Sequence, residues 1–137
     1  MNILVISSSP NTDGLTASCA KAAVDGAQQA GGQVEEVRLN DLQVGMCEAC
    51  DNGWGTCRDE HRCQVEDGFQ ALHARALQAD AYVLVTPVYW HEVSEAGKAF
   101  LDRLRRCEAT RGDGSGLLGN PVIAVAAAGG SGNGMIT

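Results

Sequence analysis

Six cysteines are the residues of this 137-residue sequence whose type and spacing could do chemistry, because four of them fall between positions 47 and 63. Four thiolates close together can hold a tetrahedral zinc ion or an iron–sulfur cluster. In a reducing compartment such clustering points to metal ligation or thiol chemistry before structural disulfides. The other two, Cys19 and Cys107, lie in expected helices and are interpreted as buried small hydrophobic residues. The clustered four are Cys47, Cys50, Cys57 and Cys63.

These four cysteines lie in a connection of about 27 residues, from position 40 to 66, between an expected strand and an expected helix. A loop of that length without secondary structure is uncommon in a compact domain and is usually functional or cross-linked. We therefore expect a single domain over residues 1–137 that carries a cysteine-rich insertion at about 40–66.

The segment after the first expected strand, residues 6–16, is rich in hydroxyl groups and contains a proline and a glycine. Free backbone N–H groups at the start of a helix, together with Ser and Thr hydroxyls, form a seat for an anion such as a phosphate monoester. A dinucleotide pyrophosphate fits less well, because the G-x-G-x-x-G pattern is absent. The alternative is that this segment only makes a turn and caps a helix.

Two adjacent aromatic residues, Tyr89 and Trp90, follow the third expected strand. Neighbouring side chains cannot both point comfortably into one core, so at least one ring is expected to lie against a flat heteroaromatic ligand. Alternatively, the rings cover the edge of the sheet or a partner subunit. A third segment, 128–134, holds four glycines, which would leave the backbone open to a ligand; the alternative is a flexible chain end.

Alternating strands and helices must position these three segments. Nearly continuous apolar runs are typical of strands that are covered on both faces, and apolar residues at helical spacing lie between them. This order predicts a parallel sheet with helices on both faces, and ligands of such sheets bind beyond the carboxyl ends of the strands. Asp67 and Ser94 are expected to cap the second and third helices. The expected strands are Ile3–Ile6, Val34–Leu39, Ala81–Thr86 and Val122–Ala128, and the expected helices are Leu15–Ala30, Asp67–Ala79 and Ser94–Cys107.

Composition and charge narrow the choice of partners. With 10 basic and 17 acidic side chains the formal net charge is −7, which gives little attraction for nucleic acid. No apolar run approaches the roughly 20 residues that cross a bilayer, so we expect no membrane partner. The first residues are interpreted as a strand and not as a signal peptide, so the expected location is cytoplasmic.

The three segments together resemble the flavodoxin-like NAD(P)H-dependent FMN (flavin mononucleotide) reductase family. Its first loop usually reads G-S-P-R-x-x-G-N-T, and this chain matches it at Ser9-Pro10, Gly14 and Thr16. Its second loop, S-P-V-Y-W, and the helix after it, which ends K-x-F-x-D-R, are matched closely by residues 86–90 and 98–103. The glycine-rich third segment fits as well, so the resemblance covers essentially the whole chain.

The resemblance implies a doubly wound parallel sheet in three α/β/α layers with FMN as the bound cofactor. The phosphate would bind to the first loop, the flavin ring to the second, and the polar edge of the ring to the third. Asn11 stands where the family usually has an arginine, which would weaken the hold on the phosphate. The implied residues are Ser9, Asn11 and Thr16 for the phosphate, Pro87, Val88, Tyr89 and Trp90 for the ring, and Gly129 and Gly130 for its edge.

The chain departs from the family in two places. The family usually continues through a further helix and a fifth strand, so we expect a sheet without that strand and a C-terminally incomplete sequence; completion by a partner subunit is the alternative. The family's iron–sulfur flavoproteins carry a compact cysteine motif in the same loop, but Gly53 occupies the position expected for their third ligand. Three states of the cysteines stay open: no metal, a cluster such as 4Fe-4S, or zinc.

The resemblance also implies an activity, the transfer of hydride from NAD(P)H through bound flavin to a quinone, a flavin or a similar acceptor. Since the flavin supplies the chemistry, no catalytic acid or base is assigned to the protein. A homodimer is a further implication. The rival hypothesis is a non-enzymatic flavin or iron–sulfur electron carrier or redox switch, which would consume almost no NAD(P)H without a partner reductase.

Overall fold

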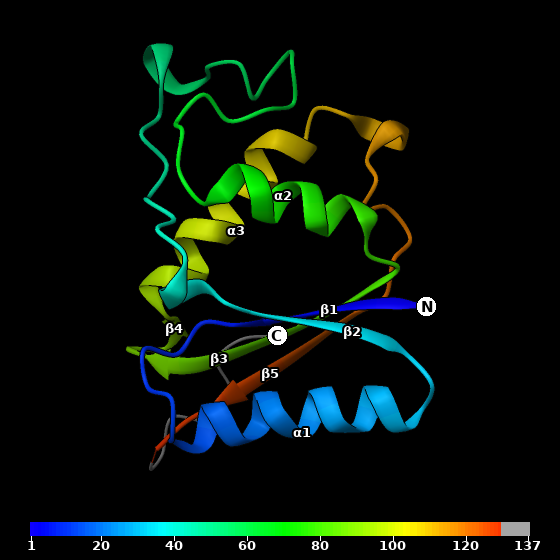
Figure 1. Cartoon of the computed structure of the whole chain (residues 1–137). Coiled ribbons are helices and arrows are strands. Elements are labelled where there is room, and N and C mark those ends of the chain that lie inside the picture. The colour runs from blue at the N-terminus through cyan, green and yellow to red at the C-terminus, as the bar shows by residue number, and fades with distance from the viewer. Residues whose placement is uncertain (130–137) are drawn as a thin grey trace.

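A computed structural model describes residues 1–129 and shows one twisted sheet with helices on both of its faces (Figure 1). Its parallel strands stand in the order β2–β1–β3–β5, with β2 and β3 on either side of β1. Within the described residues β5 pairs with no parallel strand other than β3, as expected for a sheet without the fifth strand. The parallel strands are β1 (Asn2–Ser7), β2 (Gln33–Arg38), β3 (Ala81–Tyr89) and β5 (Val122–Ala127).

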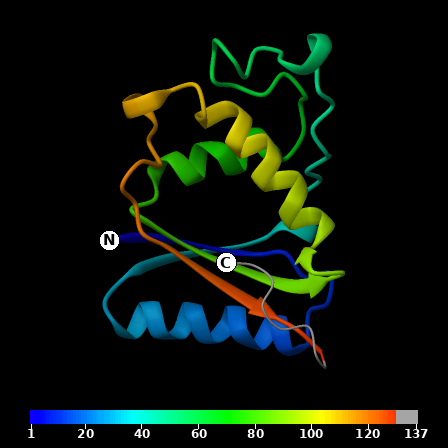
Figure 2. The same ribbon diagram turned by 180° about the vertical axis from the view of Figure 1, so that it is seen from behind.

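The helices divide between the two faces of the sheet. Helix α1 (Leu15–Gln29) covers one face, while α2 (Phe69–Gln78) and α3 (Glu95–Glu108) cover the other, as the two opposite views show (Figures 1 and 2). The three α/β/α layers and the doubly wound order confirm the predicted fold class. No helix among residues 1–129 is both long and apolar enough to cross a membrane.

Two apolar cores hold the layers together. Under α2 and α3, the side chains of Phe69, Leu72 and Phe100 are almost completely buried against β1 and β2. Under α1, small residues such as Ala20 allow the helix to lie close to Val5 and its neighbours in β3. Burial on both faces explains why the central strands appear in the sequence as continuous apolar runs.

Asp67 and Ser94 both accept a hydrogen bond at the start of a helix, but only Ser94 is an N-cap as predicted, because the N-cap position of α2 is Gly68. Asp67 accepts a hydrogen bond on Oδ1 from the backbone N–H of Phe69 at 2.9 Å, at the start of α2. Ser94 accepts on Oγ from the N–H of Gly97 at 3.3 Å, at the start of α3. Each bond satisfies an N–H group that the helix itself leaves without a partner.

The segment Thr86–Ser94, which was expected to be a loop, is mostly a hairpin. Strand β3 continues to Tyr89, and a short strand β4 (Glu92–Val93) returns antiparallel to its end. The apolar run alone placed the end of β3 three residues too early, because it does not show that the chain turns back and pairs with itself. Short 3-10 turns are also present at Leu39–Asp41, Asp51–Gly53 and Gly112–Gly114.

Candidate functional site

The carboxyl ends of β1 and β3 meet at the point where the strand order reverses. In the register of the parallel ladder Ser7 lies opposite Val85, and the N–H of the next residue, Ser8, donates to the carbonyl of Val85 at 2.9 Å. Open α/β sheets bind their ligands at such a switch point, because the loops from the two strands diverge there. The first and second predicted segments therefore start side by side.

The first loop is anchored to α3 rather than left free. The hydroxyl of Ser94 donates to the carbonyl of Ser8 at 2.7 Å, and a Cβ placed on Gly97 would lie 3.1 Å from the hydroxyl of Ser8. Both Ser8 and Ser94 are buried. The close approach of the loop to the start of α3 thus favours a glycine at position 97.

Beyond Ser8 the loop reaches the start of α1. The side chains of Ser9 and Thr16 are buried, and Ser9 accepts the N–H of Asn11 on its hydroxyl oxygen at 3.2 Å. Gly14, at the N-cap of α1, offers no side-chain acceptor to the first turn of the helix. The N–H groups of that turn keep their capacity to bind an anion, which the helix dipole favours.

The β3–β4 hairpin exposes its aromatic residues. Tyr89 is 44% and Trp90 is 95% exposed. Trp90 and His91 form the turn with positive φ angles of 48° and 69°. Positive φ at both central positions suits the twist of a two-residue hairpin, but it usually requires Asn or Gly. An exposed tryptophan held in a strained turn is expected where a ring contacts a ligand or a partner.

An open groove joins the first loop to the hairpin. Its walls come from the first loop, the segment after β2, the hairpin and the start of α3. Three of the predicted ring-binding residues, Val88, Tyr89 and Trp90, line it. Its walls include Ser8, Pro10, Met46, Cys47, Val88, Tyr89 and Trp90.

Other predicted residues lie beside the groove without lining it. This is so for the phosphate candidates of the first loop and for Pro87, which is buried in β3 opposite Ala127 of β5. Gly129 comes two residues after the end of β5, which lies parallel to β3, so it follows the carboxyl edge of the sheet. Gly130 lies outside the described residues. The phosphate candidates that do not line the groove are Ser9, Asn11 and Thr16.

The segment around Asn40 and Met46 also lines the groove, and sequence reasoning missed it. Its residues match none of the patterns that predicted the other walls. The available signal was topological, since this segment follows the carboxyl end of β2 and so leaves the sheet at the edge where ligands bind.

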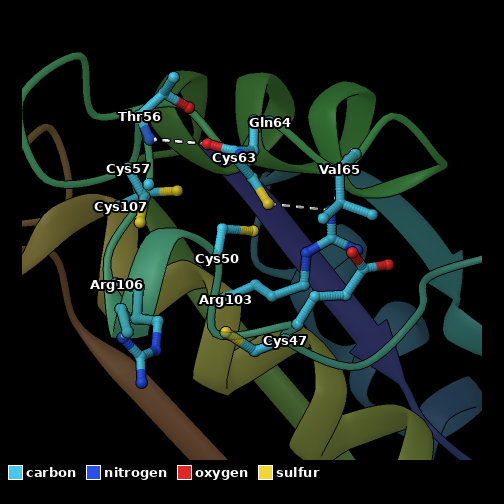
Figure 3. A pocket seen from close by; sticks show the side chains of 13 residues that line it. Cys47, Cys50, Thr56, Cys57, Cys63, Gln64, Val65, Arg103, Arg106 and Cys107 are labelled. Carbon is cyan, nitrogen blue, oxygen red and sulfur yellow. Dashed lines mark hydrogen bonds between the residues drawn. The ribbon is translucent and has the colours of Figure 1, made fainter.

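The four clustered cysteines line a second, smaller pocket between the cysteine-rich insertion and α3 (Figure 3). Cys107 of α3 lines the same pocket, so five thiols surround it. Cys107 is fully buried, as predicted, but the sequence did not indicate that it joins the others. All six cysteines are free thiols, and no group of three or more Cys, His, Asp or Glu side chains among residues 1–129 is arranged to hold a single metal ion.

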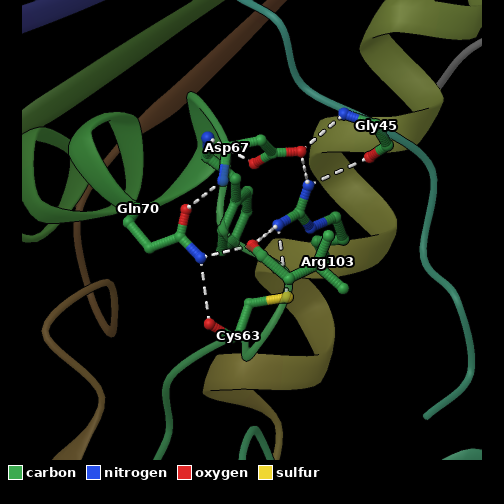
Figure 4. A network of polar contacts seen from close by, with 7 residues as sticks. Gly45, Cys63, Asp67, Gln70 and Arg103 are labelled. Atoms are coloured by element: carbon green, nitrogen blue, oxygen red, sulfur yellow. Dashed lines mark hydrogen bonds and ion pairs between the residues drawn. The ribbon is translucent and has the colours of Figure 1, made fainter.

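Arg103 of α3 fixes the insertion against the two helices (Figure 4). Its guanidinium is 1% exposed and donates from Nη1 to the carboxylate of Asp67 at 2.6 Å and to the carbonyl of Gly45 at 3.1 Å. From Nη2 it donates to the sulfur of Cys63 at 3.2 Å and to the carbonyl of Val65 at 2.8 Å. One buried cation therefore holds the beginning and the end of the insertion together.

Burial and charge shift the pKa values of Asp67 and Cys107, among others in this region. Burial alone would raise the pKa of Asp67, but hydrogen bonds from Arg103 and from the N–H groups of Gly45 and Phe69 outweigh it and lower the pKa. Burial raises the pKa of the Cys107 thiol to about 12, with a smaller contribution from neighbouring sulfurs. Both shifts follow from the tight packing between α3 and the insertion.

The groove and the cysteine pocket share a wall. Cys47 lines both of them, which makes it the thiol that links the two sites. On the far side of the pocket, Arg106 donates to the carbonyl of Gly53 and stacks over the ring of Trp54 at 5.0 Å. Gly53 has a φ of 117°, which non-glycine residues rarely adopt, so the position expected for a third family ligand has a backbone suited to glycine.

A family model described as NADPH-dependent FMN reductase matches residues 1–137. The chain belongs to this FMN reductase family. The match confirms the resemblance predicted from the strand-end segments, and with it the flavodoxin-like fold.

Proteins similar to this chain carry the names of two kinds of protein, iron–sulfur flavoproteins and a quinone oxidoreductase. An iron–sulfur flavoprotein from Methanosarcina thermophila is 31% identical, with 98% of this chain and 66% of that protein covered. Another, from Methanocaldococcus jannaschii, is 29% identical, with 77% of this chain and 52% of that protein covered. An NAD(P)H:quinone oxidoreductase from Methanothermobacter marburgensis has a similar structure, with a TM-score of 0.73 at 17% identity, over 96% of this chain and 65% of that one. The chain thus spans between half and two thirds of the length of these relatives.

Proposed function

We propose that this chain binds FMN in the groove and acts as an NAD(P)H-dependent oxidoreductase on a quinone, a flavin or a similar small acceptor. The observation that carries the proposal is the groove itself, which lies at the switch point of the sheet and places the strained, exposed Trp90 within reach of the first loop. Membership in the FMN reductase family supports the choice of cofactor.

The phosphate of FMN would bind where the first loop enters α1. Ser9 and Thr16 supply hydroxyls on buried side chains, and Asn11 supplies an exposed amide beside them. The first turn of α1 has no capping side chain, so its N–H groups and the positive end of the helix dipole face the anion without competition. These donors are neutral, so without the arginine that the family usually carries at position 11 we expect a weaker hold on the phosphate.

The flavin ring would lie against the end of β3. Val88, Tyr89 and Trp90 present apolar and aromatic surface there, with the buried Pro87 behind them, and the backbone of Gly129, with that of Gly130, would face the polar edge of the ring. Aromatic surface excludes water from a planar ligand and stacks against it.

When bound, FMN accepts a hydride from the nicotinamide and passes electrons to the acceptor. The work of the protein in such a reaction is placement. Tyr89 and Trp90 hold one side of the groove, and the anchored first loop holds the other. Fixed placement turns an encounter between two bound molecules into an effectively unimolecular step, so no side chain is assigned the role of an acid or a base.

The test is FMN binding followed by absorption and by quenching of flavin fluorescence. Trp90→Ala should weaken binding at least about 10-fold, because stacking of this kind is worth on the order of 1.5 kcal/mol. Trp54→Ala is the matched control, since Trp54 lies against Arg106 in the insertion and does not line the groove. Equal affinity for the wild type and Trp90→Ala, or no FMN binding by the wild type, would contradict the proposal.

A second candidate is an electron carrier, and the wall that Cys47 shares between the groove and the cysteine pocket favours it. Steady-state consumption of NADH and NADPH with a soluble quinone separates the two. A reductase turns over with one of the nucleotides alone, whereas a carrier requires an added reductase. The same assay gives the preference between the two nucleotides.

The remaining expectations for this single domain are proposals of the same kind. Cytoplasmic location and homodimer formation agree with a flavin reductase whose aromatic hairpin is exposed at the rim of the groove. Sedimentation of the FMN-loaded protein tests the dimer, and a monomer at micromolar concentration would contradict it. With a net charge of −7 we expect neither a nucleic-acid nor a membrane partner.

A further inference from the structure

The cysteine pocket fits an iron–sulfur cluster in the chemistry of its donors. Five thiols surround it, one more than a cubane cluster requires, and two guanidinium groups, of Arg103 and Arg106, line the same pocket. The four ligands of a cubane bind four different irons, so they lie further apart than the ligands of a single zinc ion. Which thiols serve as ligands is a question that the family pattern leaves unanswered here, because position 53 is a glycine.

Cys107 reaches the pocket from a rigid element. It lies in the last turn of α3, four residues after Arg103, and its side chain is completely buried. In Figure 3 its thiol lies with that of Cys57 on one side of the pocket, and the sulfurs of Cys50 and Cys63 lie on the other. Cys63 is close enough to both Cys50 and Cys107 for their charges to interact.

Cys47 lies apart from these four sulfurs. In the same view its sulfur lies below the sulfurs of Cys50 and Cys63 and is separated from them. It is also the cysteine that lines both the pocket and the groove. Its position places it between the two sites rather than among the converging thiols.

We propose that Cys107 takes the place of the ligand missing at position 53, and that the ligand set of this chain is Cys50, Cys57, Cys63 and Cys107, with Cys47 outside it. Each thiol would release its proton on binding iron. Arg103 would donate from Nη2 to a ligand sulfur through the hydrogen bond it already makes to Cys63 at 3.2 Å, and such bonds are one of the factors that set the potential of a cluster.

The decisive experiment compares two double variants after anaerobic reconstitution with iron and sulfide. Cys19→Ser/Cys47→Ser keeps only the four proposed ligands, whereas Cys19→Ser/Cys107→Ser keeps the four clustered cysteines of the insertion. The readouts are iron and sulfide per chain and the electron paramagnetic resonance signal after reduction. We expect about four irons per chain and a signal in the wild type and in the first variant, and loss of both in the second.

Three results would overturn the assignment: a full cluster in Cys19→Ser/Cys107→Ser, loss of the cluster in Cys19→Ser/Cys47→Ser, or uptake of zinc alone by the wild type. Cys19→Ser/Cys47→Ser leaves the buried Cys107 unchanged. This variant therefore tests the ligand set even if Cys19→Ser/Cys107→Ser fails to fold. Titration with FMN is measured in parallel on every variant. Cys47 lines the groove and Cys107 does not, so the flavin proposal is judged on the wild type and on Cys19→Ser/Cys107→Ser, separately from the ligand assignment.

Discussion

Arg103 and Cys63 are joined by a hydrogen bond of 3.2 Å between the guanidinium Nη2 and the sulfur, although 40 residues separate them in the sequence. The same guanidinium stacks over the ring of Phe69 at 4.4 Å and pairs with Asp67. One side chain thus connects the cysteine pocket, the start of α2 and the core. Its nitrogen Nε is buried without a hydrogen-bond partner in the described part of the chain, so the guanidinium is held mainly through its two terminal nitrogens.

Replacement of this cation should be the most damaging single change on α3. Arg103→Met leaves the carboxylate of Asp67 without its ion pair and removes one donor from each of two backbone carbonyls, and we expect a loss of about 3 kcal/mol in the free energy of unfolding. Urea denaturation measures it. The control is Lys21→Met, which breaks the exposed pair of Lys21 with Asp25 and should leave the free energy of unfolding almost unchanged, because solvent screens that pair. Equal losses in the two variants would show that the buried network contributes little.

Stability should fall in acid through Asp67. Its pKa is lower in the folded chain than the ordinary value of 3.8, so its ionised form stabilises the fold above that pH, and this contribution is lost as the pH falls below it. Thermal melting between pH 7 and pH 2.5 should show a steeper acid loss in the wild type than in Asp67→Asn. Arg103→Met should flatten the profile in the same way, since it removes the partner. Parallel profiles for the wild type and Asp67→Asn would contradict this.

Two substitutions of Trp90 should separate the effect of backbone strain on stability from the effect of the ring on FMN affinity. Trp90 has a φ of 48°, so Trp90→Gly should be more stable than Trp90→Ala by about 1 kcal/mol, because only glycine adopts that backbone without cost. Both variants lack the ring, so both should lose FMN affinity to the same degree. Stability is measured by thermal melting and affinity by flavin fluorescence. If Trp90→Gly restored affinity, the turn and not the ring would be the binding feature.

The hydroxyl of Ser94 should contribute both to the stability of the fold and to FMN binding. It caps α3 and anchors the carbonyl of Ser8, so Ser94→Ala should cost about 1 to 2 kcal/mol in unfolding free energy and should also weaken FMN binding by loosening the first loop. The control is Ser18→Ala, whose exposed hydroxyl donates to the carbonyl of Gly14 within α1 and makes no contact between elements. A loss of stability in Ser94→Ala with unchanged FMN affinity would show that the hydroxyl stabilises α3 but does not shape the groove.

The Cys107 thiol should resist alkylation in the metal-free protein. Burial raises its pKa to about 12, so almost none of it is thiolate at pH 8, where iodoacetamide reacts with thiolates. Mass spectrometry of the modified peptides should show Cys107 unlabelled after Cys19, which is only half-buried, has been labelled. Labelling of Cys107 at a rate similar to that of Cys19 would mean that the pocket opens readily.

The sequence by itself determined the order of strands and helices, the N-cap at Ser94, the hydrogen-bonding role of Asp67 at the start of α2, and the family. These depend on local patterns: apolar runs, a side chain that accepts a nearby N–H group, and short motifs around Ser9 and Trp90. The predictions of individual site residues from the resemblance still await the binding experiments described above.

Tertiary structure alone decided which distant residues share a site. The return of β4 onto the end of β3 depends on pairing with a strand already placed in the sheet, which no single segment encodes. Cys107 carried only the signal of a buried helical residue, and its place beside Cys63 follows from how α3 crosses the insertion. The network around Arg103 likewise joins residues up to 58 positions apart. Packing brings such groups together, because burial selects contacts by shape and charge and not by distance along the chain.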